Sequence, residues 1–134
     1  MQKKYYGTVI RGYGRGRILG FPTININLVN NELDLENGVY AVRVDICRDG
    51  ACPISTTYKG MIYIGTRPTF NMREKSIEIH LFNFNEDLYD QQISFQILQK
   101  IRDEIHFESV ENLIKQLHHD KEMVYNYFQT DINS

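Results

Sequence analysis

Three stretches of the sequence alternate apolar and polar residues with a period of two, and no helical pattern separates them. The stretches cover Val39–Ile46, Ser76–Phe84 and Gln91–Leu98. Successive side chains of a β-strand point to opposite faces, so this period is typical of strands with one buried face. Two further stretches, Tyr5–Arg11 and Tyr58–Gly65, have the β-branched and aromatic bias of strands. Together these segments predict an antiparallel barrel or sandwich.

The alternation also predicts which side chains face the core, because one set of alternate positions is mostly aliphatic or aromatic. The expected inward residues are Tyr40, Val42, Val44, Ile46, Ile77, Ile79, Leu81, Ile93, Phe95 and Ile97. The expected outward residues are Ala41, Arg43, Asp45, Glu78, His80, Phe82, Gln92, Ser94 and Gln96. Each strand should therefore be half-buried.

The last third of the chain changes to a helical period. Its apolar residues fall on one stripe of a helix: Val110, Leu113, Ile114, Leu117, Val124 and Phe128. Ser109 is suited to the N-cap, and Glu111 in the first turn complements the helix dipole. We expect a helix over about 109–128, followed by a frayed tail, packed on the outside of a β domain over about 1–108.

The composition is that of an ordinary globular chain. Of the 134 residues, 42% are hydrophobic and 24% are charged, which fits a single domain over residues 1–134. The net charge of −2 provides no basic field, so nucleic acid is disfavoured as the main partner. No apolar run is long enough to span a membrane. Cys47 and Cys52 lie five residues apart without an export signal, which predicts a reduced pair in the cytoplasm.

A glycine-rich segment follows the first strand and carries several arginines. Glycines let the backbone approach a ligand closely, successive N–H groups can bind an anion, and arginines donate forked hydrogen bonds to phosphate oxygens. The segment lacks the spacing of a Walker loop and the third glycine of the dinucleotide fingerprint. A phosphate-binding loop and a plain tight turn both remain open. The residues are Arg11, Gly12, Gly14, Arg15, Gly16, Arg17, Gly20 and Pro22.

Thr23 and Asn25 follow directly and lie two positions apart in an extended segment, so their side chains leave the same side. A hydroxyl and an amide oxygen are ligands suited to Mg²⁺, which also takes waters and substrate phosphates. Glu78 lies on the outward set of its strand and is a candidate for a cleft wall. The alternative for Glu78 is a solvated strand glutamate.

Several segments in order make the chain similar to a known family. The segment from Gly12 to Asn25 resembles the opening signature of the riboflavin kinases, which usually ends Pro-Thr-Ala-Asn. The resemblance continues at Asn37–Tyr40, Ile64–Phe70, Ile77–Phe84, Asp87–Tyr89 and Ile101–Ser109. It covers nearly the whole chain, and it departs from the usual pattern at Ile24 (Ala), Tyr63 (Asn) and Asp90 (Gly).

The resemblance implies both a fold and an activity. The fold is a mainly β, six-stranded antiparallel Greek-key barrel with a C-terminal amphipathic helix. These enzymes transfer the γ-phosphoryl group of ATP to the terminal ribityl hydroxyl of riboflavin, giving FMN and ADP. In many bacteria the domain is joined to an FMN adenylyltransferase domain that makes FAD. We expect FMN and no FAD from this chain.

Residue roles also follow from the resemblance. Thr23 and Asn25 would ligate Mg²⁺ together with the ATP phosphates, which the glycine-rich segment would bind. Glu78 would be the general base, and Arg102 and Phe107 would lie on the flavin side. A non-catalytic flavin- or nucleotide-binding module is the alternative function, and a nucleic-acid-binding barrel is disfavoured by the charge.

Overall fold

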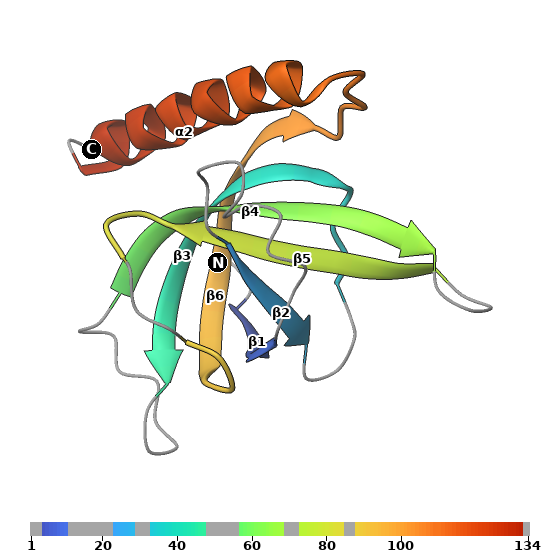
Figure 1. Ribbon diagram of the computed structural model, residues 1–134. Helices are drawn as coiled ribbons and strands as arrows, with labels where there is room; N and C mark the ends of the chain where they lie inside the picture. The colour runs from blue at the N-terminus through green and yellow to red at the C-terminus, as the bar shows by residue number, and fades with distance from the viewer. Residues whose placement is uncertain are drawn as a thin grey trace.

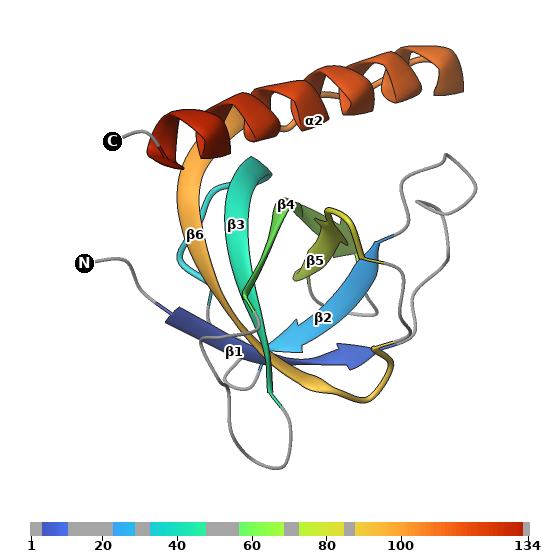
Figure 2. The same cartoon turned by 90° about the vertical axis from the view of Figure 1, so that its left-hand side faces the viewer.

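The structure is a computed structural model that describes residues 4–10, 23–28, 33–47, 57–68, 73–84 and 88–132. Within these residues, six strands form a closed antiparallel barrel, and one helix lies over the outer face of its wall (Figures 1 and 2). The elements are β1 (Lys4–Ile10), β2 (Ile24–Leu28), β3 (Gly38–Cys47), β4 (Thr57–Pro68), β5 (Arg73–Leu81), β6 (Gln92–Asp103) and α2 (Val110–Ile132).

The strands follow a Greek-key order. Strands β3, β4 and β5 pair consecutively, and β6 returns to pair with β3, while β2 pairs with β5 and β1 with both β2 and β6. A fourth strand that returns beside the first of three hairpin-connected strands defines the Greek key. The predicted barrel, its strand number and its antiparallel pairing are confirmed.

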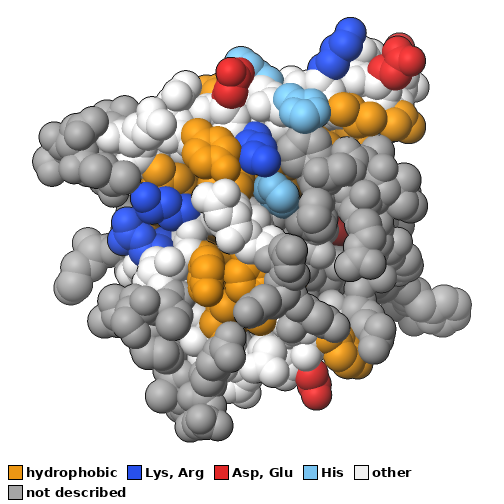
Figure 3. Space-filling view, turned by 60° about the vertical axis from the view of Figure 1, so that its left-hand side comes forward, with side chains coloured by type: hydrophobic (Ala, Val, Ile, Leu, Met, Phe, Trp, Pro, Cys, Tyr) orange, Lys and Arg blue, Asp and Glu red, His pale blue; other side chains and the backbone are white. Residues whose placement is uncertain are grey.

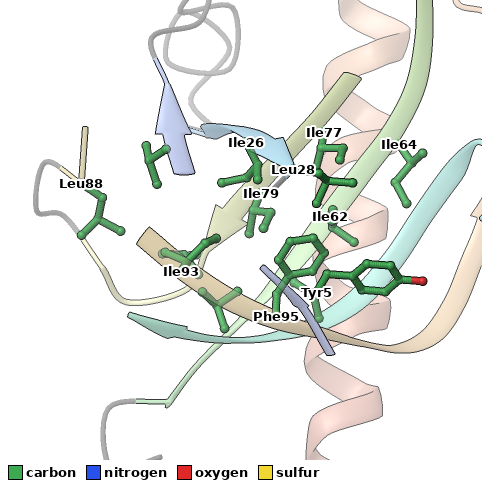
Figure 4. Close-up of a cluster of buried hydrophobic side chains, with 14 of the residues drawn as sticks. Tyr5, Ile26, Leu28, Ile62, Ile64, Ile77, Ile79, Leu88, Ile93 and Phe95 are labelled. Atoms are coloured by element: carbon green, nitrogen blue, oxygen red, sulfur yellow. The ribbon is translucent and has the colours of Figure 1, made fainter. Parts of the chain in front are cut away.

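The barrel interior is the main hydrophobic core. The predicted inward residues of β3, β5 and β6 lie there, joined by side chains from β1, β2 and β4. Tyr5 stacks on Phe95 with 5.4 Å between ring centroids (Figure 4). A second cluster covers the outer face of the barrel, where Val39, Ala41 and Met61 pack against Leu117, Val124 and Phe128 of the helix. The same strands are therefore buried on both faces where α2 lies over them.

Burial of outward side chains corrects the expectation that Val39–Ile46 is a half-buried strand. Ala41 is fully buried, and Asp45 is 7% exposed and accepts a hydrogen bond of 2.5 Å from the Thr57 hydroxyl. Ser94 and His80, also expected to be outward, are buried as well. A side chain that points away from the barrel interior can still be buried, because other parts of the chain cover the outer face.

The helix begins as predicted. The Ser109 hydroxyl accepts a hydrogen bond of 3.2 Å from the Asn112 N–H, as an N-cap does. It runs to Ile132 rather than ending near 128, and Val110 of the expected stripe is 60% exposed. The opposite face of α2 carries charged and imidazole side chains, seen at the top of Figure 3. In the part of the chain that the structure describes, no helix has the length and apolarity to cross a membrane.

Cys47 at the end of β3 is disulfide-bonded. The reduced state that the sequence predicted for this residue is therefore wrong.

Candidate active site

One row of side chains crosses the outer face of the barrel from β2 to β6. Asn25 pairs with Glu78, Glu78 with Tyr63, Tyr63 with Val39, and Val39 with Arg102. Directly opposed residues of neighbouring strands present their side chains to the same face. The strand register therefore aligns these five side chains, which we call the outer row, on the face toward α2.

A cavity of about 310 Å³ lies between the outer row and the first half of α2. Its walls are partly polar and partly apolar, as in sites for small organic ligands. The lining includes Thr23, Tyr63, Ser76, Glu78, Arg102, Glu104, Phe107, Leu113 and Leu117.

The predicted general base lies in this cavity. Glu78 is half-buried on β5, and its neighbours across the strands are Asn25 and Tyr63. Thr23, directly before β2, lines the same cavity. The structure thus brings the predicted metal ligands Thr23 and Asn25 next to Glu78, which supports the cleft-wall interpretation over a solvated glutamate.

The predicted flavin residues lie at the opposite wall of the cavity. Arg102, near the end of β6, holds its Cζ atom 5.7 Å from the centroid of the Phe107 ring. Two register irregularities between β3 and β6 precede this position and bring Arg102 opposite Val39. Gly38 permits the close approach of the strands here, because a Cβ atom would lie 2.4 Å from the Arg102 carbonyl oxygen.

Two residues of α2 that bind each other beside Arg102 were not assigned a role from sequence. Asp120 of α2, which is fully buried, binds the Arg102 guanidinium through Nε and Nη2, each at 2.8 Å. Gln116 donates a third hydrogen bond of 2.8 Å to the same carboxylate. A signal was present, because Asp120 falls three residues after Leu117 and four before Val124, on the apolar stripe of the helix.

Tyr63 stands where the family pattern usually has Asn, and its side chain is partly buried in the outer row. Its hydroxyl donates to the Met61 Sδ atom at 3.3 Å. Burial raises the pKa of Tyr63, and the nearby Asp120 carboxylate acts in the same direction. The phenol therefore stays neutral and remains a hydrogen-bond donor at physiological pH.

The predicted phosphate-binding segment lies outside the described residues. This applies to Arg11, Gly12, Gly14, Arg15, Gly16, Arg17, Gly20 and Pro22. Its two flanks are described, and they meet beside the site, because Ile10 of β1 pairs with Asn25 of β2.

A divalent cation has suitable donors at the start of β2. The Thr23 hydroxyl and the Asn25 amide are hard oxygen donors beside the Glu78 carboxylate, and they fit Mg²⁺ when substrate phosphates supply further ligands. Within the described ranges, no group of three His, Cys, Asp or Glu side chains forms a metal cluster.

Sequence comparisons place this chain in a known family. The Flavokinase family model, described as riboflavin kinase, matches residues 2–128. The bifunctional riboflavin kinase/FMN adenylyltransferase of Buchnera aphidicola subsp. Schizaphis graminum is 40% identical over 124 residues, covering 91% of this chain and 38% of that protein. The Bacillus subtilis protein of the same name is 36% identical over 125 residues, covering 91% and 37%. The chain therefore spans less than two fifths of the length of these relatives.

Solved structures have the same fold. A Streptococcus pneumoniae protein described as a macrolide-efflux protein superposes with a TM-score of 0.79 at 34% identity, covering 92% of this chain and 38% of that one. Riboflavin kinase from Trypanosoma brucei superposes with a TM-score of 0.63 at 22% identity, covering 94% and 79%, which supports the fold alone. From the family match over residues 2–128, the chain belongs to the riboflavin kinase family.

Proposed function

We propose that this chain transfers the γ-phosphoryl group of ATP to the terminal ribityl hydroxyl of riboflavin, giving FMN and ADP. The observation that carries the proposal is the position of Glu78, half-buried in the wall of a cavity beside Thr23 and Asn25. The cavity volume of about 310 Å³ is in the range of sites that enclose small organic ligands.

In this proposal, Glu78 accepts the proton of the attacking hydroxyl. The ribityl oxygen forms a bond to the γ-phosphorus, the bond from that phosphorus to the β–γ bridging oxygen breaks, and ADP leaves. Phosphoryl transfer depends mainly on positioning and charge stabilisation, so a single carboxylate is sufficient as the proton acceptor. A barrel strand, β5, holds this carboxylate at the cavity wall.

Thr23 and Asn25 are proposed to hold Mg²⁺ with the ATP phosphates, whose charge the metal would neutralise when bound. The arginines and glycines between Ile10 and Thr23 would bind the same phosphates. Thr23→Ala or Asn25→Ala should raise the Mg²⁺ concentration needed for half-maximal activity. An unchanged Mg²⁺ dependence in both variants would remove these residues from the metal site.

Arg102 and Phe107 are proposed to bind the flavin at the opposite wall of the cavity. The guanidinium and the aromatic ring lie together there, and a planar ring with carbonyl groups suits both. The relatives' names include FMN adenylyltransferase, so we propose that the chain can act as the kinase part of such a protein. The cytoplasmic location stays a prediction.

The test is to incubate the purified chain with riboflavin, ATP and Mg²⁺ and to separate the flavins by chromatography. FMN should form only when all three components are present. If riboflavin binds but is never phosphorylated, the chain is a flavin-binding module and Glu78 loses the proposed role.

A further inference from the structure

A buried hydrogen-bonded network joins the helix to the cavity wall. Asp120 is fully buried, and the Arg102 side chain is 15% exposed. The carboxylate accepts three hydrogen bonds of 2.8 Å, two from Arg102 and one from Gln116. We call these three residues the Arg102 brace.

The geometry of the Arg102 brace fixes the plane of the guanidinium. A bidentate pair between Arg and a carboxylate holds both groups in one plane, unlike a single hydrogen bond. Gln116 lies one helical turn before Asp120, and its amide restrains the carboxylate from the side. Rotation of the guanidinium would leave a buried charge without its partner, which is strongly unfavourable.

The brace also leaves hydrogen-bonding capacity on Arg102 for a ligand. A guanidinium has five N–H groups. Two bind Asp120, and one on Nη1 binds the Asp103 carbonyl oxygen at 3.1 Å. Among the residues that the structure describes, the other two have no partner, and Arg102 lines the cavity.

We propose that Asp120 and Gln116 are positioning residues that orient the Arg102 guanidinium toward the carbonyl-bearing ring of riboflavin. The inference rests on the proposed function and extends it, because it makes the docking of α2 a condition for a complete flavin site. Neither side chain needs to touch the substrate, since both act through Arg102.

A purely structural role is the competing explanation, in which the pair only attaches the helix to the barrel. The helix already has an apolar attachment, in which Leu117, Val124 and Phe128 pack against the barrel. A buried ion pair is often no more stabilising than apolar residues in its place. The two roles predict different effects of removing the Asp120 charge. A positioning role predicts weaker riboflavin binding, and a purely structural role predicts lower stability alone.

The experiment is a titration of riboflavin against the chain, followed by quenching of flavin fluorescence, which requires no ATP. Asp120→Asn keeps the size of the side chain and removes its charge. We expect it to raise the Kd for riboflavin by about 10–100-fold, the loss of one charge-assisted interaction. The KM for ATP should change much less.

Val124→Ala is the matched control, because Val124 is fully buried one turn after Asp120 and is not part of the brace. It should lower the Tm by about 3–8 °C through a cavity while leaving riboflavin affinity nearly unchanged. Gln116→Ala keeps the ion pair and should weaken riboflavin binding by a smaller factor than Asp120→Asn. If Asp120→Asn does not fold, Gln116→Ala is the variant that tests the positioning role.

The outcomes separate the two proposals. If the wild-type chain binds riboflavin and Asp120→Asn, or Gln116→Ala in its place, binds it equally well, the positioning role is wrong and the kinase proposal stands. If Val124→Ala weakens binding as much as Asp120→Asn, helix docking alone explains the effect. If the wild-type chain binds no riboflavin, the proposed function and the positioning role are both wrong.

Discussion

At the scale of single residues, the proposed chemistry depends on one carboxylate held by a strand, that of Glu78. Glu78→Gln keeps the side-chain shape but removes the basic oxygen, so we expect kcat to fall by about 10²–10⁴. Riboflavin and ATP binding should be largely retained. Glu104→Gln is the matched control, because Glu104 also lines the cavity but is exposed at its rim. Steady-state kinetics that show near-normal turnover for Glu78→Gln would contradict the assignment.

Tyr63 should make the stability of the chain depend on alkaline pH. Its pKa is raised above the ordinary 10.0, first by burial, so the folded chain retains the phenol proton at pH values where the unfolded chain releases it. The unfolded state then binds fewer protons, and stability falls as pH rises above 10. This contribution is fully present below pH 10. We expect the free energy of unfolding to fall by up to about 1.4 kcal/mol per pH unit from this group.

Tyr63→Phe should flatten this alkaline decline, measured by denaturant unfolding at several pH values from neutral to strongly alkaline. Burial also raises the pKa of Tyr40. That group is present in both proteins and cancels in the comparison. If the free energy of unfolding falls equally with pH in the variant and the wild type, Tyr63 has the same pKa in the folded and unfolded states.

Some residues of the site could be predicted from sequence and others could not. Glu78, Thr23 and Asn25 belong to continuous motifs, so the family resemblance could single them out, and their roles stay predictions. Asp120 lies in a helix that meets the barrel only in the folded chain. The local sequence shows only that the Asp120 carboxylate lies on the apolar stripe of its helix. It does not show that Arg102 is its partner.

At the scale of elements, the turn before β6 carries local strain. The Leu88 carbonyl accepts a hydrogen bond of 2.9 Å from the Gln91 N–H, and Asp90 at the third position has φ of 73°. A type II turn requires a positive φ at this position, which favours glycine. The family pattern has glycine at this position, so the turn tolerates Asp90 but does not require it.

We therefore expect Asp90→Gly to raise the free energy of unfolding by about 0.5 kcal/mol, the difference between relieved strain and the greater freedom of glycine when unfolded. Asp90→Ala should lower it by about 1 kcal/mol, because alanine tolerates a positive φ less well than aspartate. Urea unfolding of the three proteins tests the order. A variant with alanine as stable as that with glycine would show that the turn changes conformation.

The ends of the strands were less predictable than their existence. β6 continues to Asp103, past the expected end at Leu98, because two register irregularities opposite β3 interrupt the period of two without ending the pairing. β4 likewise extends from the expected Tyr58–Gly65 to Thr57–Pro68, paired with β5 along this length. Hydrogen bonding to a partner sustains a strand where its own sequence pattern stops.

At the scale of the whole molecule, the order of the strands could not be derived from periodicity. The alternation left a barrel and a sandwich open, since both place period-two strands in sequence. The Greek-key order came from the family resemblance, and the pairing of β3 with β6 and β2 with β5 confirms it. These contacts join segments that are distant in sequence, which local patterns do not encode.

The cavity is bounded by both the barrel and α2, so a ligand within it should stabilise the two together. A ligand that binds only the folded state raises the free energy of unfolding by about 2.7 kcal/mol at a concentration of 100 Kd. We expect saturating riboflavin to slow amide hydrogen exchange in β5 and in the first half of α2 by comparable factors. The control is the same exchange measurement on Asp120→Asn, at a riboflavin concentration that gives the same occupancy as in the wild type. It tests whether the protection of α2 depends on the Arg102 brace. Protection confined to the barrel strands would mean that the ligand does not engage α2, and that the cavity between them is not the flavin site.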